Sequence, residues 1–100
     1  MARNTPEGKV KAAIKAYLNA LGVFHRWPVP NGMGGDQLDC YGCNTGRYFT
    51  IEVKRDDRPA KPTARQERHL KQVADAGGIA IVATSAEDVK QAFFEANLPF

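Results

Sequence analysis

The sequence has 100 residues, of which 43% are hydrophobic and 25% charged, and these proportions are typical of one folded, water-soluble domain rather than a disordered chain. No hydrophobic run approaches the roughly 18 residues that a membrane-spanning helix needs, and the first residues lack the hydrophobic stretch of a secretory signal, so we expect one cytoplasmic domain over residues 1–100. The formal net charge is +3, yet residues 1–71 carry thirteen Lys and Arg against seven acids, whereas residues 72–100 carry one Lys against four acids.

The first third of the chain predicts a helix and a strand. Thr5 can cap a helix whose first turn holds Pro6 and Glu7, and hydrophobic residues then recur at helical spacing until Gly22. Glu7 has two interpretations: an acid that complements the helix dipole, or an additional acid of a metal site. Residues 23–29 predict a strand, and the glycine-rich residues 31–37 predict a flexible loop that lacks the lysine of a phosphate-binding P-loop.

Two further strands are expected over residues 38–43 and 47–54, joined by a tight turn at residues 44–46. This hairpin would bring Asp39 and Glu52 alongside each other. In the second strand Ile51 and Val53 fall on one face, whereas Glu52 and Lys54 fall on the other. Such alternation is also how an ordinary half-exposed strand looks. However, two acids can hold a hard divalent cation and a lysine can orient the attacking water, which is the chemistry of a metal-dependent phosphodiesterase.

The last 40 residues predict helix, strand and helix. Thr63 and Gln66 match a capping box, and Gln66 shares a helical face with Leu70 and Val73, so that it faces the sheet. The hydrophobic run of residues 79–83 indicates a central or parallel strand, and Ser85 caps a final helix. The predicted order is α-β-β-β-α-β-α, an α/β sandwich around a mixed sheet.

The basic residues and the two cysteines are further candidates for functional groups. A basic surface beside an acidic site suits a nucleic-acid substrate. Cys40 and Cys43 form a C-x-x-C motif, but a zinc site would need His25 and His69 as further ligands at unusual spacing. We therefore interpret the cysteines as reduced and structural. The candidate nucleic-acid-binding residues are Arg47, Arg55, Arg58, Lys61 and Arg65.

Together these elements resemble the VRR-NUC branch of the PD-(D/E)XK nuclease superfamily, over nearly the whole chain. The resemblance lies in an N-terminal helix with Glu7, a glycine-rich segment before Asp39, a hairpin, the Glu52-Val53-Lys54 strand and a helix with Gln66. One departure is that Leu38 stands where the family has proline, but proline coordinates nothing.

The resemblance implies a restriction-endonuclease-like fold and a Mg²⁺- or Mn²⁺-dependent endonuclease that acts on DNA. In that case Asp39, Glu52 and the Val53 carbonyl would bind the metal, Lys54 would position or activate water, and Gln66 and Glu7 would complete the site. Two alternatives remain: a non-catalytic DNA-binding or regulatory module that keeps the fold, and a zinc-binding interaction module.

The resemblance to single-domain members of the family also implies a symmetric homodimer that cuts branched DNA such as four-way (Holliday) junctions. Hydrophobic residues near the C-terminus are candidates for the interface, although they can equally close the core of one subunit. They are Phe93, Phe94, Leu98 and Phe100.

Overall fold

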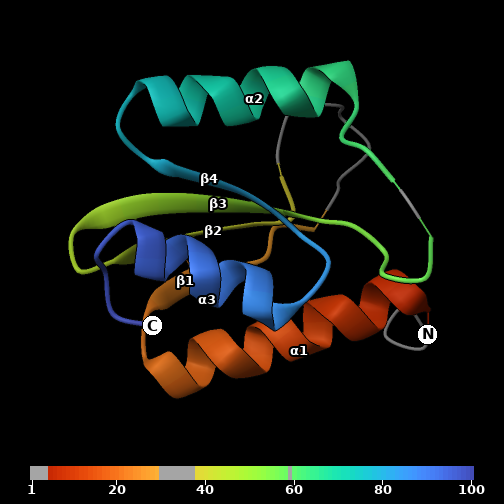
Figure 1. The fold of residues 1–100 in the computed structure, drawn as a ribbon, viewed down its shortest axis with the longest axis horizontal. Helices are drawn as coiled ribbons and strands as arrows, with labels where there is room; N and C mark the ends of the chain where they lie inside the picture. Colours follow the sequence, from red (N-terminus) through yellow and green to blue (C-terminus); the bar gives the residue numbers. More distant parts are fainter. Residues whose placement is uncertain (1–4, 30–37, 59) are drawn as a thin grey trace.

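The computed structural model describes residues 5–29, 38–58 and 60–100, and in these residues it has three helices and four strands (Figure 1). Their order confirms the predicted α-β-β-β-α-β-α succession. The elements are α1 (Pro6–Leu21), β1 (Phe24–Arg26), β2 (Cys40–Asn44), β3 (Arg47–Val53), α2 (Ala64–Asp75), β4 (Ile79–Ala83) and α3 (Ala86–Glu95).

The four strands form one mixed sheet in the order β1-β2-β3-β4, in which β1 to β3 are antiparallel and β4 runs parallel to β3. The predicted parallel strand is therefore confirmed, although β4 lies at the edge of the sheet rather than at its centre. An edge strand can be hydrophobic here because α2 and α3 both contact β4.

The β2–β3 hairpin sets the register on which the site depends. Its two-residue turn consists of Thr45 at φ 53° and Gly46 at φ 84°, and two successive positive φ values are typical of the tight turn that matches strand twist. The pairing aligns Cys40 with Ile51. One residue further along, Asp39 therefore lies opposite Glu52, as the sequence predicted.

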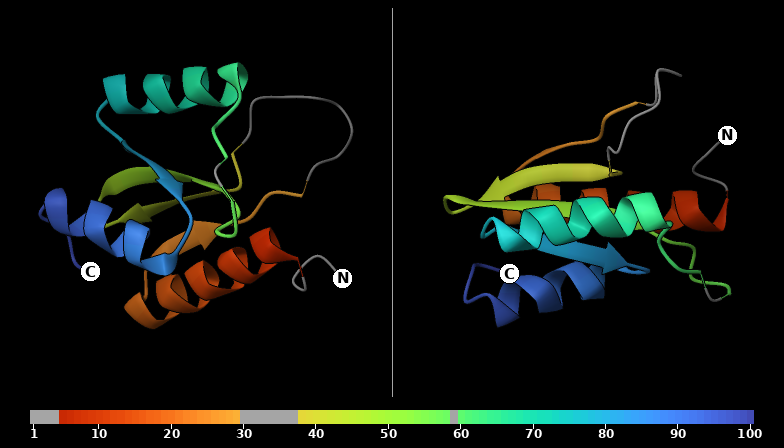
Figure 2. Two further views of the ribbon diagram at one scale, coloured as in Figure 1. Left: turned by 45° about the vertical axis from the view of Figure 1, so that its right-hand side comes forward. Right: turned by 90° about the horizontal axis from the view of Figure 1, so that it is seen from above.

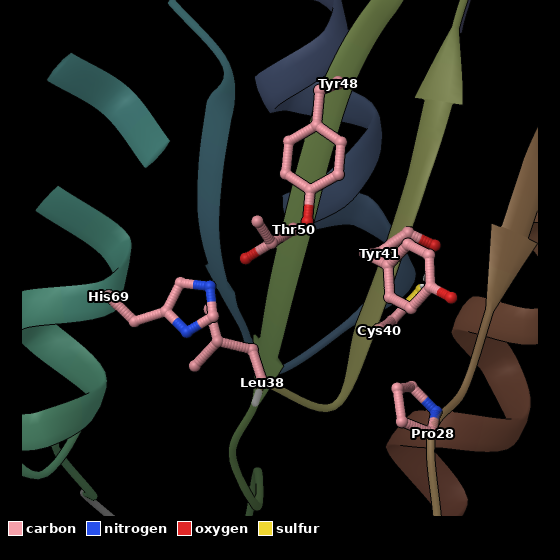
Figure 3. Close-up of a pocket in the computed structure, with 7 residues that line it drawn as sticks. All are labelled: Pro28, Leu38, Cys40, Tyr41, Tyr48, Thr50 and His69. Carbon is pink, nitrogen blue, oxygen red and sulfur yellow. Dashed lines mark hydrogen bonds between the residues drawn. The ribbon is translucent and has the colours of Figure 1, made fainter. Parts of the chain in front are cut away.

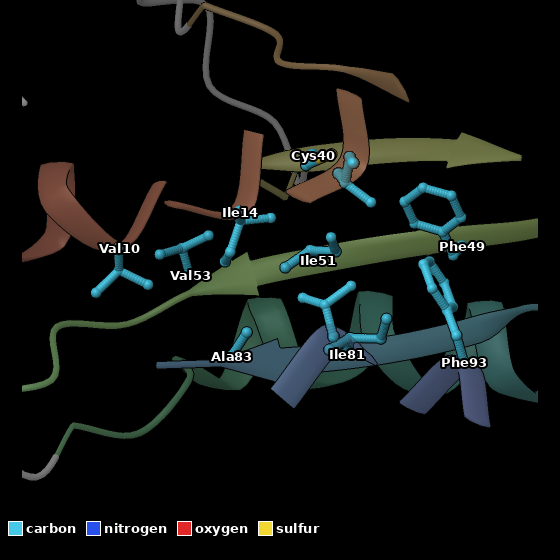
Figure 4. Packing of buried hydrophobic residues seen from close by; sticks show 11 residues of the cluster. Val10, Ile14, Cys40, Phe49, Ile51, Val53, Ile81, Ala83 and Phe93 are labelled. Carbon is cyan, nitrogen blue, oxygen red and sulfur yellow. The ribbon is translucent and has the colours of Figure 1, made fainter. Parts of the chain in front are cut away.

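Helices cover the two faces of the sheet unequally. In Figures 1 and 2, α1 and α3 lie on one side of the sheet and α2 lies alone on the other. The hydrophobic core is on the α1–α3 side, where Ile14 and Ile51 are fully buried and the Phe49 and Phe93 rings meet edge to face at 5.1 Å (Figure 4). No residue of α2 is fully buried.

Helix α1 begins and ends as the sequence indicates. The Thr5 hydroxyl accepts a hydrogen bond from the Gly8 N–H at 2.9 Å, and Gly22 ends the helix at φ 82°. Strand β1 is shorter than the predicted 23–29 and ends at Arg26. Pro28, two residues later, has no N–H to donate to a neighbouring strand. The loop predicted over residues 31–37 lies outside the described residues.

The C-terminal aromatic residues divide into two groups. Phe93 is buried and Leu98 packs against the core, as expected for residues that close the core of one subunit. Phe94 and Phe100 instead pair with each other at 5.2 Å and are 54% and 52% exposed. In the described part of the chain, no helix has the length and hydrophobicity needed to cross a membrane.

Candidate active site

The candidate site lies on the α2-facing side of β3, at the end of that strand. Ile51 and Val53 point into the core, so Glu52 and Lys54 project to the other face, as predicted. Glu52 is only 4% exposed, and 14% of the Lys54 side chain is exposed. A carboxylate buried to this degree is uncommon unless it is paired or serves a specific function.

Asp39 is fixed beside Glu52 by the backbone of β3. Its Oδ2 accepts a hydrogen bond from the Val53 N–H at 2.7 Å. Two carboxylates from neighbouring chain segments thus lie together. The second oxygen of Asp39, Oδ1, is left free to pair with Lys11. The structure brings the predicted pair of Asp39 and Glu52 together.

Glu7 reaches the pair indirectly, through a residue that the sequence analysis missed. The Lys11 ammonium lies 3.1 Å from Asp39 Oδ1 and 3.3 Å from Glu7 Oε2. Burial opposes the charge of Lys11, but the two carboxylates outweigh that effect and raise the pKa of Lys11. The four-residue spacing of Glu7 and Lys11 is a helical ion-pair signal, but nothing local indicates the contact with Asp39.

Gln66 joins the site to the start of α2. Its Nε2 donates to Glu52 Oε2 at 2.8 Å, and its Oε1 accepts from Lys54 Nζ at 3.1 Å. Lys54 Nζ is also 3.2 Å from Glu52 Oε2. The same Gln66 Oε1 accepts from the Thr63 N–H in a complete capping box. The structural and functional interpretations of Gln66 are therefore compatible, because one side chain makes both sets of contacts.

The electrostatics of the site favour a cation. Burial, followed by the negative charge of Asp39, raises the pKa of Glu52 to about 7, although the Lys54 ammonium acts in the opposite direction. Two adjacent carboxylates in a partly buried site repel each other, and a positive charge between them relieves this repulsion. In the described residues, however, no group of three or more His, Cys, Asp or Glu side chains forms a ready metal cluster.

The predicted DNA-binding residues do not form one surface patch. Arg55 pairs with Asp57 immediately after β3, and Arg58 and Lys61 are exposed in the same connection. Arg47 is at the other end of β3, where its Nε donates to the Gly77 carbonyl at 2.9 Å. Arg47 is five positions along the strand from Glu52, a distance of roughly 17 Å. Arg65 lies in the first turn of α2, near Gln66.

Both cysteines are free, as predicted. Cys40 belongs to the core, and burial raises the pKa of its thiol to about 12. Cys43 is exposed. Near β1, His25 Nδ1 accepts a hydrogen bond from the Trp27 indole N–H and His25 Nε2 donates one to Asn19 Oδ1, whereas His69 lies on α2. Among the described residues, these two cysteines and two histidines therefore do not come together as a Cys2His2 site.

The fold matches that of a known domain. A solved structure described as "VRR_NUC domain" superposes with a TM-score of 0.72, covers 91% of this chain and 96% of its own, and is 26% identical in sequence. No protein-family model and no curated protein matches the chain. The structural match confirms the resemblance seen in the sequence, and the chain has the α/β fold of the VRR_NUC nuclease family.

Proposed function

We propose that this chain is a divalent-metal-dependent endonuclease that hydrolyses phosphodiester bonds in DNA. The observation that carries the proposal is the convergence of Asp39, Glu52, Lys54 and Gln66, which lie on three separate segments, in one partly buried cluster. A purely structural strand would expose such charged side chains to water. The nuclease-family fold supports the same conclusion.

The donor set suits Mg²⁺ or Mn²⁺. Both ions prefer oxygen ligands and carboxylates. Burial and then the charge of Asp39 raise the pKa of Glu52, and a cation held between the two carboxylates would favour their ionised forms. Asp39, Glu52 and the Val53 carbonyl would hold the ion, with Glu7 as a further acid near it. When bound, the ion would supply Lewis-acid stabilisation of the charge that develops on the phosphate.

Lys54 and Gln66 have positioning roles in this proposal. Gln66 Oε1 and Glu52 Oε2 hold the Lys54 ammonium on the α2 side of β3, where it can orient a water molecule or a phosphate oxygen by donating a hydrogen bond. Gln66 is in turn held by the capping box of α2. Rigid support of this kind keeps reacting groups in a productive geometry.

The substrate that we propose is branched DNA, cut by a homodimer. One site cuts one strand, so two-fold symmetry is the simplest way to place two sites against opposed strands of a four-way junction. The exposed Phe94–Phe100 pair is the candidate contact between subunits. Arg55, Arg58, Lys61 and Arg65 would bind phosphates near the cut, and Arg47 would bind farther along the duplex.

Cleavage of labelled duplex, flap and four-way-junction DNA tests the activity. The purified chain should cut at least one of them with Mg²⁺ or Mn²⁺ and none with EDTA. Asp39→Asn and Glu52→Gln should lose cleavage but keep the fold and DNA binding, whereas the matched control Glu95→Gln, an exposed acid on α3, should cut normally. DNA binding without cleavage under all conditions would instead indicate a regulatory module.

Light scattering on a sizing column tests the assembly. We expect a dimer at micromolar concentration, and Phe94→Ala should shift it toward monomer. A monomer that makes paired, symmetric junction cuts would contradict a stable dimer. A monomer that only nicks would leave the nuclease proposal standing and remove the junction-resolving one.

A further inference from the structure

A pocket of about 370 Å³ lies next to the acid pair on the α2-facing side of the sheet (Figure 3). Its walls include Leu38, Tyr41 and Tyr48, and His69 extends toward it from α2. This volume is within the range of about 300–1,000 Å³ that is common for small-ligand sites. The pocket is largely hydrophobic and aromatic, unlike the neighbouring charged cluster.

Thr50 places an unsatisfied polar group in this pocket. The residue is 1% exposed, and its Oγ1 is buried with no hydrogen-bond partner among the described residues. Figure 3 shows its side chain between His69 and the two tyrosines. Buried hydroxyls without partners are rare in folded proteins and call for an explanation. A bound molecule with a donor or acceptor on its edge would satisfy Thr50.

The tyrosines provide a surface for stacking. The rings of Tyr41 and Tyr48 are inclined by only 22° with centroids 6.5 Å apart, and the residues are 38% and 46% exposed. Exposed aromatic side chains are the usual platform for binding unpaired nucleobases, because every base has a face that can stack. Lys54 and Arg55 directly follow β3, and Arg65 lies in the first turn of α2 next to Gln66, so positive charge is available beside the acid pair.

The distance to the acid pair fits one nucleotide. Thr50 and Glu52 are two residues apart on the same face of β3, so their backbone positions are about 7 Å apart. A nucleobase and the phosphate on the same sugar are separated by one furanose ring, which is a distance of the same order. A phosphate at Asp39 and Glu52 would therefore carry its base toward Thr50.

The geometry points to a nucleobase-binding pocket that takes an unstacked base from the nucleotide next to the scissile phosphate. The base would stack on the tyrosine surface and hydrogen-bond to the Thr50 hydroxyl. This inference rests on the proposed nuclease function and adds the recognition of an extruded base to it. Extruding a base costs least where it is already unpaired or poorly stacked, so the pocket would favour nucleotides at branch points over regular duplex.

The test compares DNA with and without the base. After cleavage positions are mapped, each nucleotide that flanks the cut is replaced in turn by an abasic residue, and binding of the labelled DNA is measured by fluorescence anisotropy with Ca²⁺ in place of Mg²⁺. If no cut is found, every position of the junction strand is scanned. At one position, wild-type binding should weaken about five-fold or more, the lower range for loss of one stacked base.

Two variants and one control locate the effect. Tyr41→Ala and Thr50→Val should bind normal and abasic DNA equally. Both variants should fold, since Tyr41 is exposed and Thr50→Val replaces an unsatisfied hydroxyl with a methyl group of similar size. Glu95→Gln, at an exposed acid on α3, is the control and should keep the preference for the base.

The outcomes separate this inference from the proposed function. Metal-dependent cleavage with no sensitivity to an abasic residue at any position would overturn the pocket and leave the nuclease intact. A base preference without cleavage under any condition would support the pocket and contradict the nuclease. Loss of the preference in Glu95→Gln as well, or a preference that persists unchanged in both Tyr41→Ala and Thr50→Val, would overturn the inference.

Discussion

From Phe49 to Val53, the two faces of β3 are similarly closed to water but differ in chemistry. Phe49, Ile51 and Val53 are fully buried on the α1–α3 face, while Thr50 and Glu52 are 1% and 4% exposed on the α2 face. The first face is hydrophobic and covered by two helices. The second is polar, and α2 covers it without burying any of its own residues completely. Burial alone therefore does not identify the core of this protein.

The difference shows where stability and function reside. Burial of hydrophobic side chains on the α1–α3 face is the main source of stability, and it holds β3 rigid. The α2 face instead buries a carboxylate and an unsatisfied hydroxyl, each of which disfavours folding. Binding and catalytic sites often contain such locally unfavourable arrangements. Substitutions on the α1–α3 face should therefore mainly lower stability, whereas substitutions on the α2 face should mainly lower activity.

The largest effect is expected on the cleavage rate, for a substitution on the α2 face. Lys54→Ala should reduce cleavage by about 100-fold or more, the range for a group that assists proton transfer, with little change in fold. Lys54→Arg should restore only part of the activity, because a planar guanidinium presents its donors differently from an ammonium. Single-turnover cleavage and circular dichroism measure the two properties.

Lys71→Ala is the control for Lys54. Lys71 is exposed on α2 and pairs with Asp75 at 2.7 Å, away from the site, so its loss should leave cleavage unchanged. If Lys54→Ala cleaves at the rate of the parent, Lys54 is only a solvated strand residue and the two faces do not differ as described.

A second comparison concerns packing. Ile51→Ala, on the core face, should lower the free energy of unfolding by roughly 2–5 kcal/mol because it leaves a cavity among fully buried residues. Leu70→Ala, on α2, should cost less than half as much, since Leu70 is only partly buried. Urea denaturation of both variants measures the difference. Equal losses would show that α2 is as tightly packed as α1 and α3.

The smallest expected effect is a pH-dependent gain in stability when Glu52 is replaced by glutamine. Folding raises the pKa of Glu52 from 4.5 to about 7, first through burial and then through Asp39. Below pH 4.5 the Glu52 carboxyl is protonated in both the folded and the unfolded chain, so its burial carries no charge penalty. As pH rises through 7 the buried carboxyl ionises in the folded chain, and the free energy of unfolding is then lower than it was at low pH.

Glu52→Gln cannot ionise and should therefore melt at a higher temperature than the parent at pH 8 in EDTA, with the difference shrinking toward pH 4.5. Melting curves at the two pH values check this, with Glu95→Gln as the control for removing an exposed acid. A difference of the same size at both pH values would show that ionisation of Glu52 is not its cause.

Local sequence signals determined most of the fold and the identity of the acids. Thr5, Thr63 and Ser85 mark the helix starts, because a cap needs only three or four neighbouring residues. The turn at Thr45 and Gly46 and the alternation along β3 place Asp39 opposite Glu52. These features depend on backbone geometry within a few residues, and the sequence therefore predicted them.

Only the tertiary structure decided which distant side chains meet. The contact of Lys11 with Asp39 depends on how α1 packs against the sheet, and the separation of Phe93 from Phe94 depends on which side of α3 faces the core. The pocket at Thr50 arises because α2 lies over β3 and β4 but leaves the tyrosines of the hairpin exposed. No periodicity or spacing encodes such contacts, because packing between segments far apart in the chain creates them.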